Sequence, residues 1–133
     1  MHGKGRLLKS MVLVDANVLL RYVLDDHADL SPKARDVMID NDILILAQVI
    51  AEVIYVLKGV YKFSREEIVD ALLEIHTMVN VIFEEEDVLV SALKEYRDTN
   101  LDFVDVLLYS HQKIKGISVI TFDKELSAKL SKL

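Results

Sequence analysis

Short apolar runs alternate with helical stripes along this chain, and this alternation predicts the fold. Runs that fit buried strands cover residues 11–14, 43–46, 79–83 and 117–121. Between and after them, apolar residues recur at helical spacing. The helices predicted from this spacing begin near residues 18, 32, 48, 64, 86, 102 and 124.

Capping residues mark several of these helix ends. Ser31 fits an N-cap, and Ser64 with Glu67 has the spacing of a capping box. Gly59 and Gly116 follow helical stretches and are predicted to stop them.

Because the strands alternate with helices and no hairpin turn joins them, we expect a parallel sheet with helices on both faces. The predicted class is α/β, a three-layer α/β/α arrangement with a central parallel sheet of four or five strands. Residues 11–133 are expected to form one domain, since a chain of 133 residues is close to the usual domain size. Residues 1–10 are interpreted as an N-terminal extension or a cloning remnant and are left out of the fold prediction.

The composition limits the possible functions. The absence of Cys excludes disulfides and thiolate zinc sites and fits a reducing cytoplasm. The net charge of −6 argues against a protein held on nucleic acid by a wide basic surface. The longest apolar stretch, 43–57, is shorter than the ~20 residues of a membrane span, so no membrane segment is expected.

Acidic residues lie where the strands are predicted to end. Asp15 closes the first strand, Asp123 follows the last, and Asp102 with Asp105 opens the helix before it, while Glu52 lies on the helix that leaves the second strand. In open parallel sheets, sites form beyond the carboxyl ends of the strands. These acids are therefore the candidate site.

Each acid also has a purely structural interpretation. Glu52 is the only charge within 43–57, so its burial would be costly, but it could instead lie at a partly exposed position or in a salt bridge. Asp15, Asp102 and Asp123 could each cap the helix that follows, and Asp105 could simply favour the positive start of its helix. For Asp102 the capping interpretation is preferred.

Converging carboxylates require cations, because like charges about 4 Å apart repel by roughly 4 kcal/mol near a protein surface. Oxygen ligands without Cys or paired His suit Mg²⁺ or Mn²⁺, which also bind substrate phosphate. Such an ion can activate water, so the chemistry indicated is phosphodiester hydrolysis.

Four segments, in order, resemble the signature motifs of PIN domains, especially VapC-like toxins. They are residues 12–22 (VLVDANVLLRY), 50–53 (IAEV), 101–108 (LDFVDVLL) and 119–123 (VITFD). The resemblance spans Met11 to Leu133.

The resemblance assigns roles to individual residues. It implies metal-binding and catalytic roles for Asp15, Glu52 and Asp105, with Asp123 as a more variable fourth acid. Asp102 is an additional acid that some members share, and Asn17 and Thr121 fit supporting polar positions that orient carboxylates or a water. Val106 stands where many relatives have Ala, a packing change that leaves the ligands unaffected.

By resemblance, the expected activity is Mg²⁺- or Mn²⁺-dependent endonucleolytic cleavage of RNA by metal-activated water. The family also implies a homodimer and a small antitoxin protein as partner. Two other readings stay open: a PIN-like RNA-binding or interaction module with little turnover, and a receiver-type phosphoacceptor. The phosphoacceptor is disfavoured because the first strand offers only Asp15 and Lys124 is poorly placed.

Overall fold

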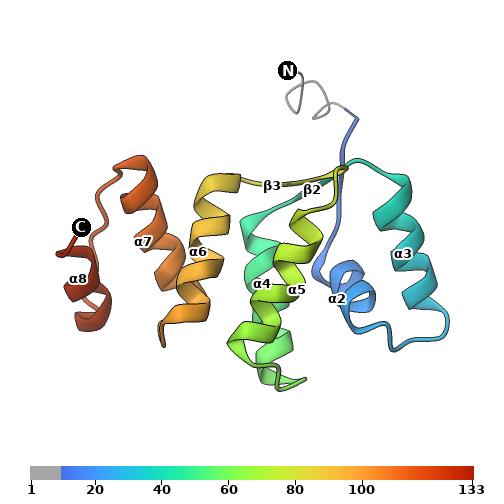
Figure 1. Ribbon diagram of the computed structural model, residues 1–133, viewed down its shortest axis with the longest axis horizontal. Helices are drawn as coiled ribbons and strands as arrows, with labels where there is room; N and C mark the ends of the chain where they lie inside the picture. The colour runs from blue at the N-terminus through green and yellow to red at the C-terminus, as the bar shows by residue number, and fades with distance from the viewer. Residues whose placement is uncertain (1–9) are drawn as a thin grey trace.

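The computed structural model describes residues 10–133 and shows an α/β fold in which helices surround a small sheet (Figure 1). The predicted extension, residues 1–10, lies outside the described residues apart from Ser10. The elements are β1 (Val12–Leu13), α2 (Ala16–Leu24), α3 (Leu30–Asp40), β2 (Ile43–Ile45), α4 (Ala47–Gly59), α5 (Arg65–His76), β3 (Val81–Phe83), α6 (Glu86–Asp98), α7 (Phe103–Lys115) and α8 (Lys124–Leu130).

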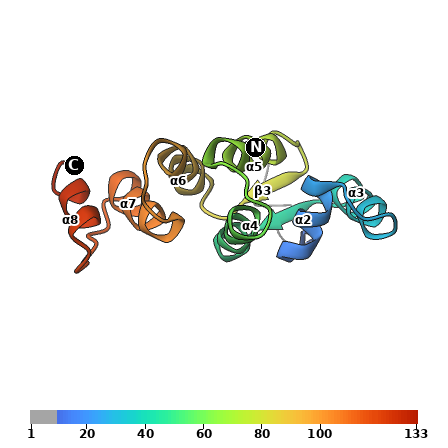
Figure 2. The ribbon, with the colours of Figure 1, turned by 90° about the horizontal axis from the view of Figure 1, so that it is seen from below.

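The sheet is parallel, as predicted, with the strand order β1-β2-β3. Leu13 pairs with Leu44, which pairs with Ile82. Viewed along the layers, α5 covers one face of the sheet, and α2 and α4 cover the other (Figure 2). The three-layer prediction is therefore confirmed, but the described residues form three strands rather than four or five.

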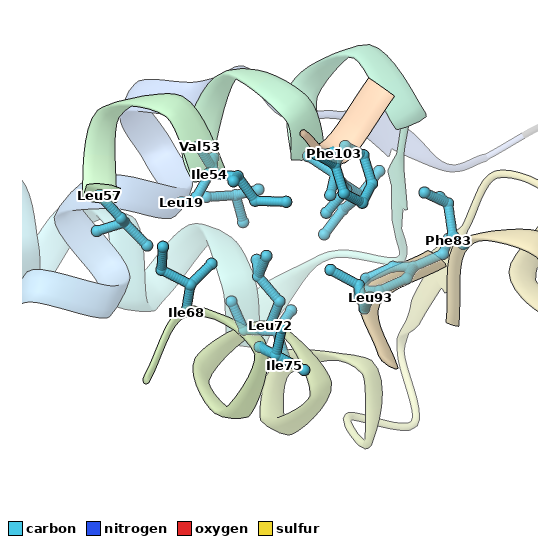
Figure 3. Close-up of a cluster of buried hydrophobic side chains, with 14 of the residues drawn as sticks. Leu19, Val53, Ile54, Leu57, Ile68, Leu72, Ile75, Phe83, Leu93 and Phe103 are labelled. Atoms are coloured by element: carbon cyan, nitrogen blue, oxygen red, sulfur yellow. The ribbon is translucent and has the colours of Figure 1, made fainter. Parts of the chain in front are cut away.

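The core lies between these layers and joins the two helical faces through the sheet. Figure 3 shows Leu19, Val53 and Ile54 on one side facing Ile68 and Leu72 on the other. Phe83 of β3 and Phe103 at the start of α7 close one end of this core and are almost fully buried. Removing this apolar surface from water is the main stabilising contribution to the fold.

The predicted helix ends are partly correct. Ser64 and Glu67 form the capping box, with the Glu67 amide donating to Ser64 Oγ at 3.1 Å and the Ser64 amide donating to Glu67 Oε1 at 2.8 Å. Gly116 ends α7 in the left-handed conformation at φ 72°. Gly59 is the last residue of α4 rather than the one after it.

The prediction that Ser31 is an N-cap is wrong. α3 begins two residues earlier than predicted, at Leu30, with Asp29 at the N-cap position. Ser31 is buried, and its hydroxyl donates to the backbone carbonyl of Arg21 at 2.9 Å. The side chain therefore joins α3 to α2 instead of capping its own helix.

The first strand is less buried than its sequence predicts. Val12 is 37% exposed and Leu13 is 61% exposed, although the run was expected to be buried on both faces. β1 lies at one edge of the sheet and its main contacts are with β2, whereas β3, at the other edge, is buried because α5 and α6 pack against it.

The predicted fourth strand, residues 117–121, is absent as well. α6, α7 and α8 lie one after another on the side of β3, away from β1 and α2, and residues 117–122 join α7 to α8 (Figures 1 and 2). β1 forms one edge of the sheet and β3 the other, and α4, α5 and α6 lie between the segment and β1. The segment pairs with neither edge of the sheet, β1 or β3, and forms no strand.

No helix within residues 10–133 combines the length and apolar character that a membrane span requires.

Candidate active site

Asp15 ends the first strand and caps the helix that follows. Its backbone is extended, at φ −91° and ψ 177°, and its Oδ1 accepts the amide of Val18 at 3.1 Å. Oδ2 accepts no hydrogen bond from a described residue. Asp15 is exposed and lies in an open groove of about 620 Å³ beside β1. The helix-capping interpretation is therefore confirmed, and one oxygen is left for another partner.

Glu52 lies on the solvent side of α4. Val53, Ile54 and Leu57 of this helix face the core, whereas Glu52 and Tyr55 are exposed, Tyr55 at 78%. The idea that Glu52 is a charge forced against the core is wrong, because the carboxylate takes the outer side of an otherwise apolar helix. No described residue forms a salt bridge with it.

A second group of acids gathers around Asp105, on the first turn of α7. Asp105 is half-buried, and this burial, followed by the negative charges of Asp123, Asp102 and Glu125, raises the pKa of its carboxyl above the usual value. Asp102 occupies the N-cap position of α7 without a capping hydrogen bond from its side chain. Glu125 has no place in the predicted site, although it stands two residues after Asp123.

Asp123 is held in place by its neighbours. Its Oδ2 accepts the amide of Leu126 at 2.8 Å, which caps α8, and its own amide donates to the hydroxyl oxygen of Thr121 at 3.0 Å. Thr121 thus fixes the backbone at this acid. Asn17, the other predicted supporting residue, is exposed in the first turn of α2 and makes no side-chain hydrogen bond with a described residue.

The acids fall into two groups rather than one. Asp15 starts α2, whereas Asp102, Asp105 and Asp123 start α7 and α8, and both views place α4 between α2 and α7 (Figures 1 and 2). Within residues 10–133, no three Asp, Glu or His residues lie close enough together to hold a metal ion. The donor atoms suit a hard cation, but their arrangement in one copy of the chain does not.

A cavity of about 610 Å³ runs along α4 and the start of α7. Its lining places Lys58 and Lys62 in the same cavity as Asp102 and Asp105, with Tyr55 also exposed to it. Positive charges beside carboxylates suit a ligand that carries phosphate. The analysis of the sequence missed this pair, although two lysines four residues apart at the end of the helix that carries Glu52 could have indicated it.

Arg65 fixes the loop that precedes α7. Its Nη1 donates to the carbonyl oxygens of Tyr96 at 2.9 Å and Leu101 at 2.7 Å, and its guanidinium carbon lies 4.0 Å from the centre of the Tyr96 ring. These contacts, together with the buried Phe103, hold the turn on which Asp102 and Asp105 stand. The sequence offered no signal for this role, because it depends on contacts between residues far apart in the chain.

Comparison with models of known protein families matches residues 12–130 to the model described as PIN domain. The match includes every candidate site residue. Neither the search of curated proteins nor the search of solved structures gives a match.

Proposed function

This chain belongs to the PIN-domain family, and from that premise we propose that it is a divalent-metal-dependent endoribonuclease. The family indicates a nuclease-type function. The proposal adds RNA as the substrate, Mg²⁺ or Mn²⁺ as the cofactor, and the carboxylates of Asp15, Glu52, Asp105 and Asp123 as the ligand and catalytic set.

The observation that carries the proposal is the acidic group around Asp105. Burial and three neighbouring acids all disfavour the charged form of this carboxylate. A protein keeps such an arrangement at a stability cost, which a bound cation would offset. All members of the group provide only oxygen donors, the ligands that Mg²⁺ and Mn²⁺ prefer.

The lysines of the cavity support a polyanionic substrate. Lys58 and Lys62 line the same cavity as Asp102 and Asp105, so a phosphate bound by the lysines would lie near these acids. This local pair is compatible with the acidic overall charge of −6, because it requires no wide basic surface.

The deciding experiment replaces each acid by its amide and maps the cleavage of a defined RNA panel with Mn²⁺ or Mg²⁺. We expect Asp15→Asn, Glu52→Gln and Asp105→Asn each to abolish cleavage, while Asp102→Asn is milder. Asn is a good N-cap, so Asp15→Asn tests the charge without removing the cap. Asp36→Asn, an exposed acid of α3, is the matched control. Wild-type cleavage by all three amide variants would falsify the assignment.

Metal binding gives a measurement that is independent of turnover. Mn²⁺ or Mg²⁺ at millimolar concentration should raise the melting temperature, because a ligand that binds only the folded chain stabilises it. Asp15→Asn should show a smaller gain. An unchanged melting temperature in the wild type would count against a metal site.

We further propose that the enzyme is the toxin of a VapC-type pair, that it forms a homodimer, and that a small antitoxin protein blocks its site. The support is the resemblance of the ordered motifs to these toxins. Co-expression with a short neighbouring reading frame should suppress cleavage by the wild type, whereas an unrelated small protein should not.

The division of the acids favours one alternative, an RNA-binding module with little turnover. In that case Lys58→Ala with Lys62→Ala would weaken RNA binding and its salt dependence, while the acid variants would change nothing. Lys33→Ala, on the exposed side of α3, is the control for a lost surface charge. Metal-dependent RNA products from the wild type that disappear in Asp105→Asn would exclude this alternative.

A further inference from the structure

The open edge of the sheet and the unpaired segment of residues 117–122 complement each other. β1 has a strand neighbour on one side only. The Val12 amide donates to the Asp42 carbonyl at 2.9 Å, on the side of β2, so the backbone groups of Leu13 point to the open side by the alternation of a strand. An exposed sheet edge of this kind readily accepts another strand.

The groove beside this edge is mainly apolar. It is lined by Val12, Leu13, Val14, Asp15, Val18, Val37, Asn41, Leu46 and Val49. Asp15 stands at the end of β1 within this groove. A strand added here would therefore bury apolar surface and end next to Asp15 if it ran parallel to β1.

The segment of residues 117–122 has the features of such a strand. Its side chains alternate, with Val119 and Thr121 half-buried towards α7 and α8, while Ile120 is 92% exposed and Phe122 is 101% exposed. Within the described residues, its only backbone hydrogen bond runs from the Val119 amide to Gln112 Oε1 at 3.0 Å. The outer face is apolar, and the remaining backbone groups are available for pairing.

The chain's own β1 is out of reach in this conformation. α4, α5 and α6 separate the segment from β1 in both views (Figures 1 and 2). α7 is fixed in place by the buried Phe103 and Val106, and α8 packs on α7 through Leu126 and Tyr109. A second copy of the chain can present its segment to β1 without disturbing these contacts.

We infer that two copies of the chain exchange residues 117–122, each adding this segment as a parallel strand beside β1 of the other. This inference rests on the proposed function only where it concerns the site. A parallel arrangement brings the carboxyl ends of both strands together, so Asp123 of one copy comes to lie beside Asp15 of the other. Asp105 accompanies Asp123, because the two acids share one region of the same copy.

The exchange unites the two acidic groups that a single copy keeps apart. Asp15 of one copy faces Asp105 and Asp123 of the other, and two-fold symmetry makes two such composite sites. Three carboxylates at one site repel one another unless a cation binds between them. Mg²⁺ or Mn²⁺ should therefore stabilise the dimer as well as the site.

Cross-linking tests the exchange directly, because the chain has no Cys of its own. Leu13→Cys in a tagged chain and Ile120→Cys in an untagged chain are refolded together and treated with a short bifunctional maleimide. We expect a cross-linked pair of one tagged and one untagged chain. Val79→Cys, at a position 98% exposed in the turn before β3, replaces Ile120→Cys as the matched control and should give no such pair.

The double variant Leu13→Cys with Ile120→Cys separates exchange from closure within one chain. Cross-linked dimers support the exchange. Cross-linked monomers alone would overturn it, since the segment would then have closed on its own β1, and so would the absence of any cross-link. Sedimentation adds a second measurement: Ile120→Asp should dissociate the dimer at least tenfold more readily, while Val79→Asp leaves it unchanged.

A mixture of inactive variants links the exchange to catalysis. Asp15→Asn and Asp105→Asn refolded together should recover about a quarter of the wild-type activity, because half of the dimers are mixed and one of the two sites in each is intact. If cross-links form and the wild type cuts no RNA, the proposed function fails and the exchange stands. If the wild type cuts RNA and the mixture recovers nothing, the exchange fails and the nuclease stands.

Discussion

Two apolar segments of this chain have similar sequences, but one forms a buried strand and the other forms no strand. β3, Val81–Phe83, lies against β2 and is buried on both faces, with Phe83 1% exposed. Residues 117–122 are as rich in β-branched and aromatic side chains, yet they form no strand, and Phe122 is 101% exposed. The difference lies in what each segment meets: β3 meets the edge of β2, and the later segment meets only α7 and α8.

This comparison shows that strand propensity alone does not decide whether a segment forms a strand. β-propensity measures how well a side chain fits a pleated, half-buried surface, so it is realised only where such a surface exists. The same argument applies to β1, whose Leu13 is 61% exposed because β1 lacks the helix contacts that α5 and α6 make with β3. Both segments thus lack the packing partners that β3 has among the described residues.

The largest expected difference in stability is between substitutions of Phe83 in β3 and Phe122 in the unpaired segment. Phe83→Ala should lower the free energy of unfolding by about 3–5 kcal/mol, because it leaves a cavity in the core. Phe122→Ala should change it by less than about 0.5 kcal/mol in the monomer, since nothing packs on this ring. Urea unfolding at low protein concentration measures both. A large loss in Phe122→Ala under these conditions would mean that the segment is buried in the monomer.

Two leucines extend the comparison from strands to cores. Leu72 and Leu126 are both 0% exposed, but Leu72 belongs to the large core, whereas Leu126 packs in a small cluster with Tyr109 and Leu130. Leu72→Ala should cost about 2–5 kcal/mol of global stability. Leu126→Ala should cost less, about 1–2 kcal/mol, because α8 can open without unfolding the sheet.

Hydrogen exchange distinguishes these two outcomes for the leucine pair. In Leu126→Ala, the amides of α8 should exchange at least tenfold faster while those of α4 and α5 keep their protection. Equal acceleration throughout the chain would show that the small cluster unfolds together with the main core.

Much of the fold could be predicted from local features. The capping box of Ser64 and Glu67 acts within four residues, so the sequence alone specifies where α5 begins. The left-handed stop at Gly116 is local in the same way. Ser31 was misassigned because its hydroxyl bonds to Arg21, ten positions away, and no local rule contains that contact.

The sequence predicts the local features of the candidate site residues better than their positions relative to one another. The position of Asp15 after an apolar run identified it correctly as a helix cap. The sequence pattern overestimates the burial of Glu52. An amphipathic helix with a narrow polar side has almost the same pattern of apolar residues as a fully buried helix. The separation of Asp15 from Asp105 depends on which side of the sheet α6 and α7 take, and local patterns do not encode that choice.

Asp15 and Asp123 each accept a capping hydrogen bond, the first at α2 beside the main core and the second at α8, so they allow the same bond to be compared in the two regions. Asp15→Ala should lower the global free energy of unfolding by about 1 kcal/mol, the usual value of an N-cap, because α2 packs on the core. Asp123→Ala removes an equivalent bond from α8 and should speed exchange there with a smaller global effect. Asp15→Asn and Asp123→Asn, which keep the capping acceptor, serve as controls. Equal global losses at both positions would contradict the separate opening of α8.

The smallest expected effect on stability concerns Asp105, because its surroundings disfavour its negative charge. Burial and the neighbouring acids raise the pKa of Asp105 in the folded chain above its value in the unfolded chain. As pH rises, the unfolded chain loses its proton first, so stability is lost between the two pKa values and stays lost at neutral pH. Without metal, Asp105→Asn should therefore melt roughly 1–2 °C higher than the wild type at pH 7. The difference should vanish below about pH 3, where the carboxyl is protonated in both states. Asp36→Asn, on α3 and outside this acidic group, is the matched control. With Mg²⁺ or Mn²⁺ bound in the exchanged dimer the order should reverse, because the cation then favours the charge that the monomer disfavours.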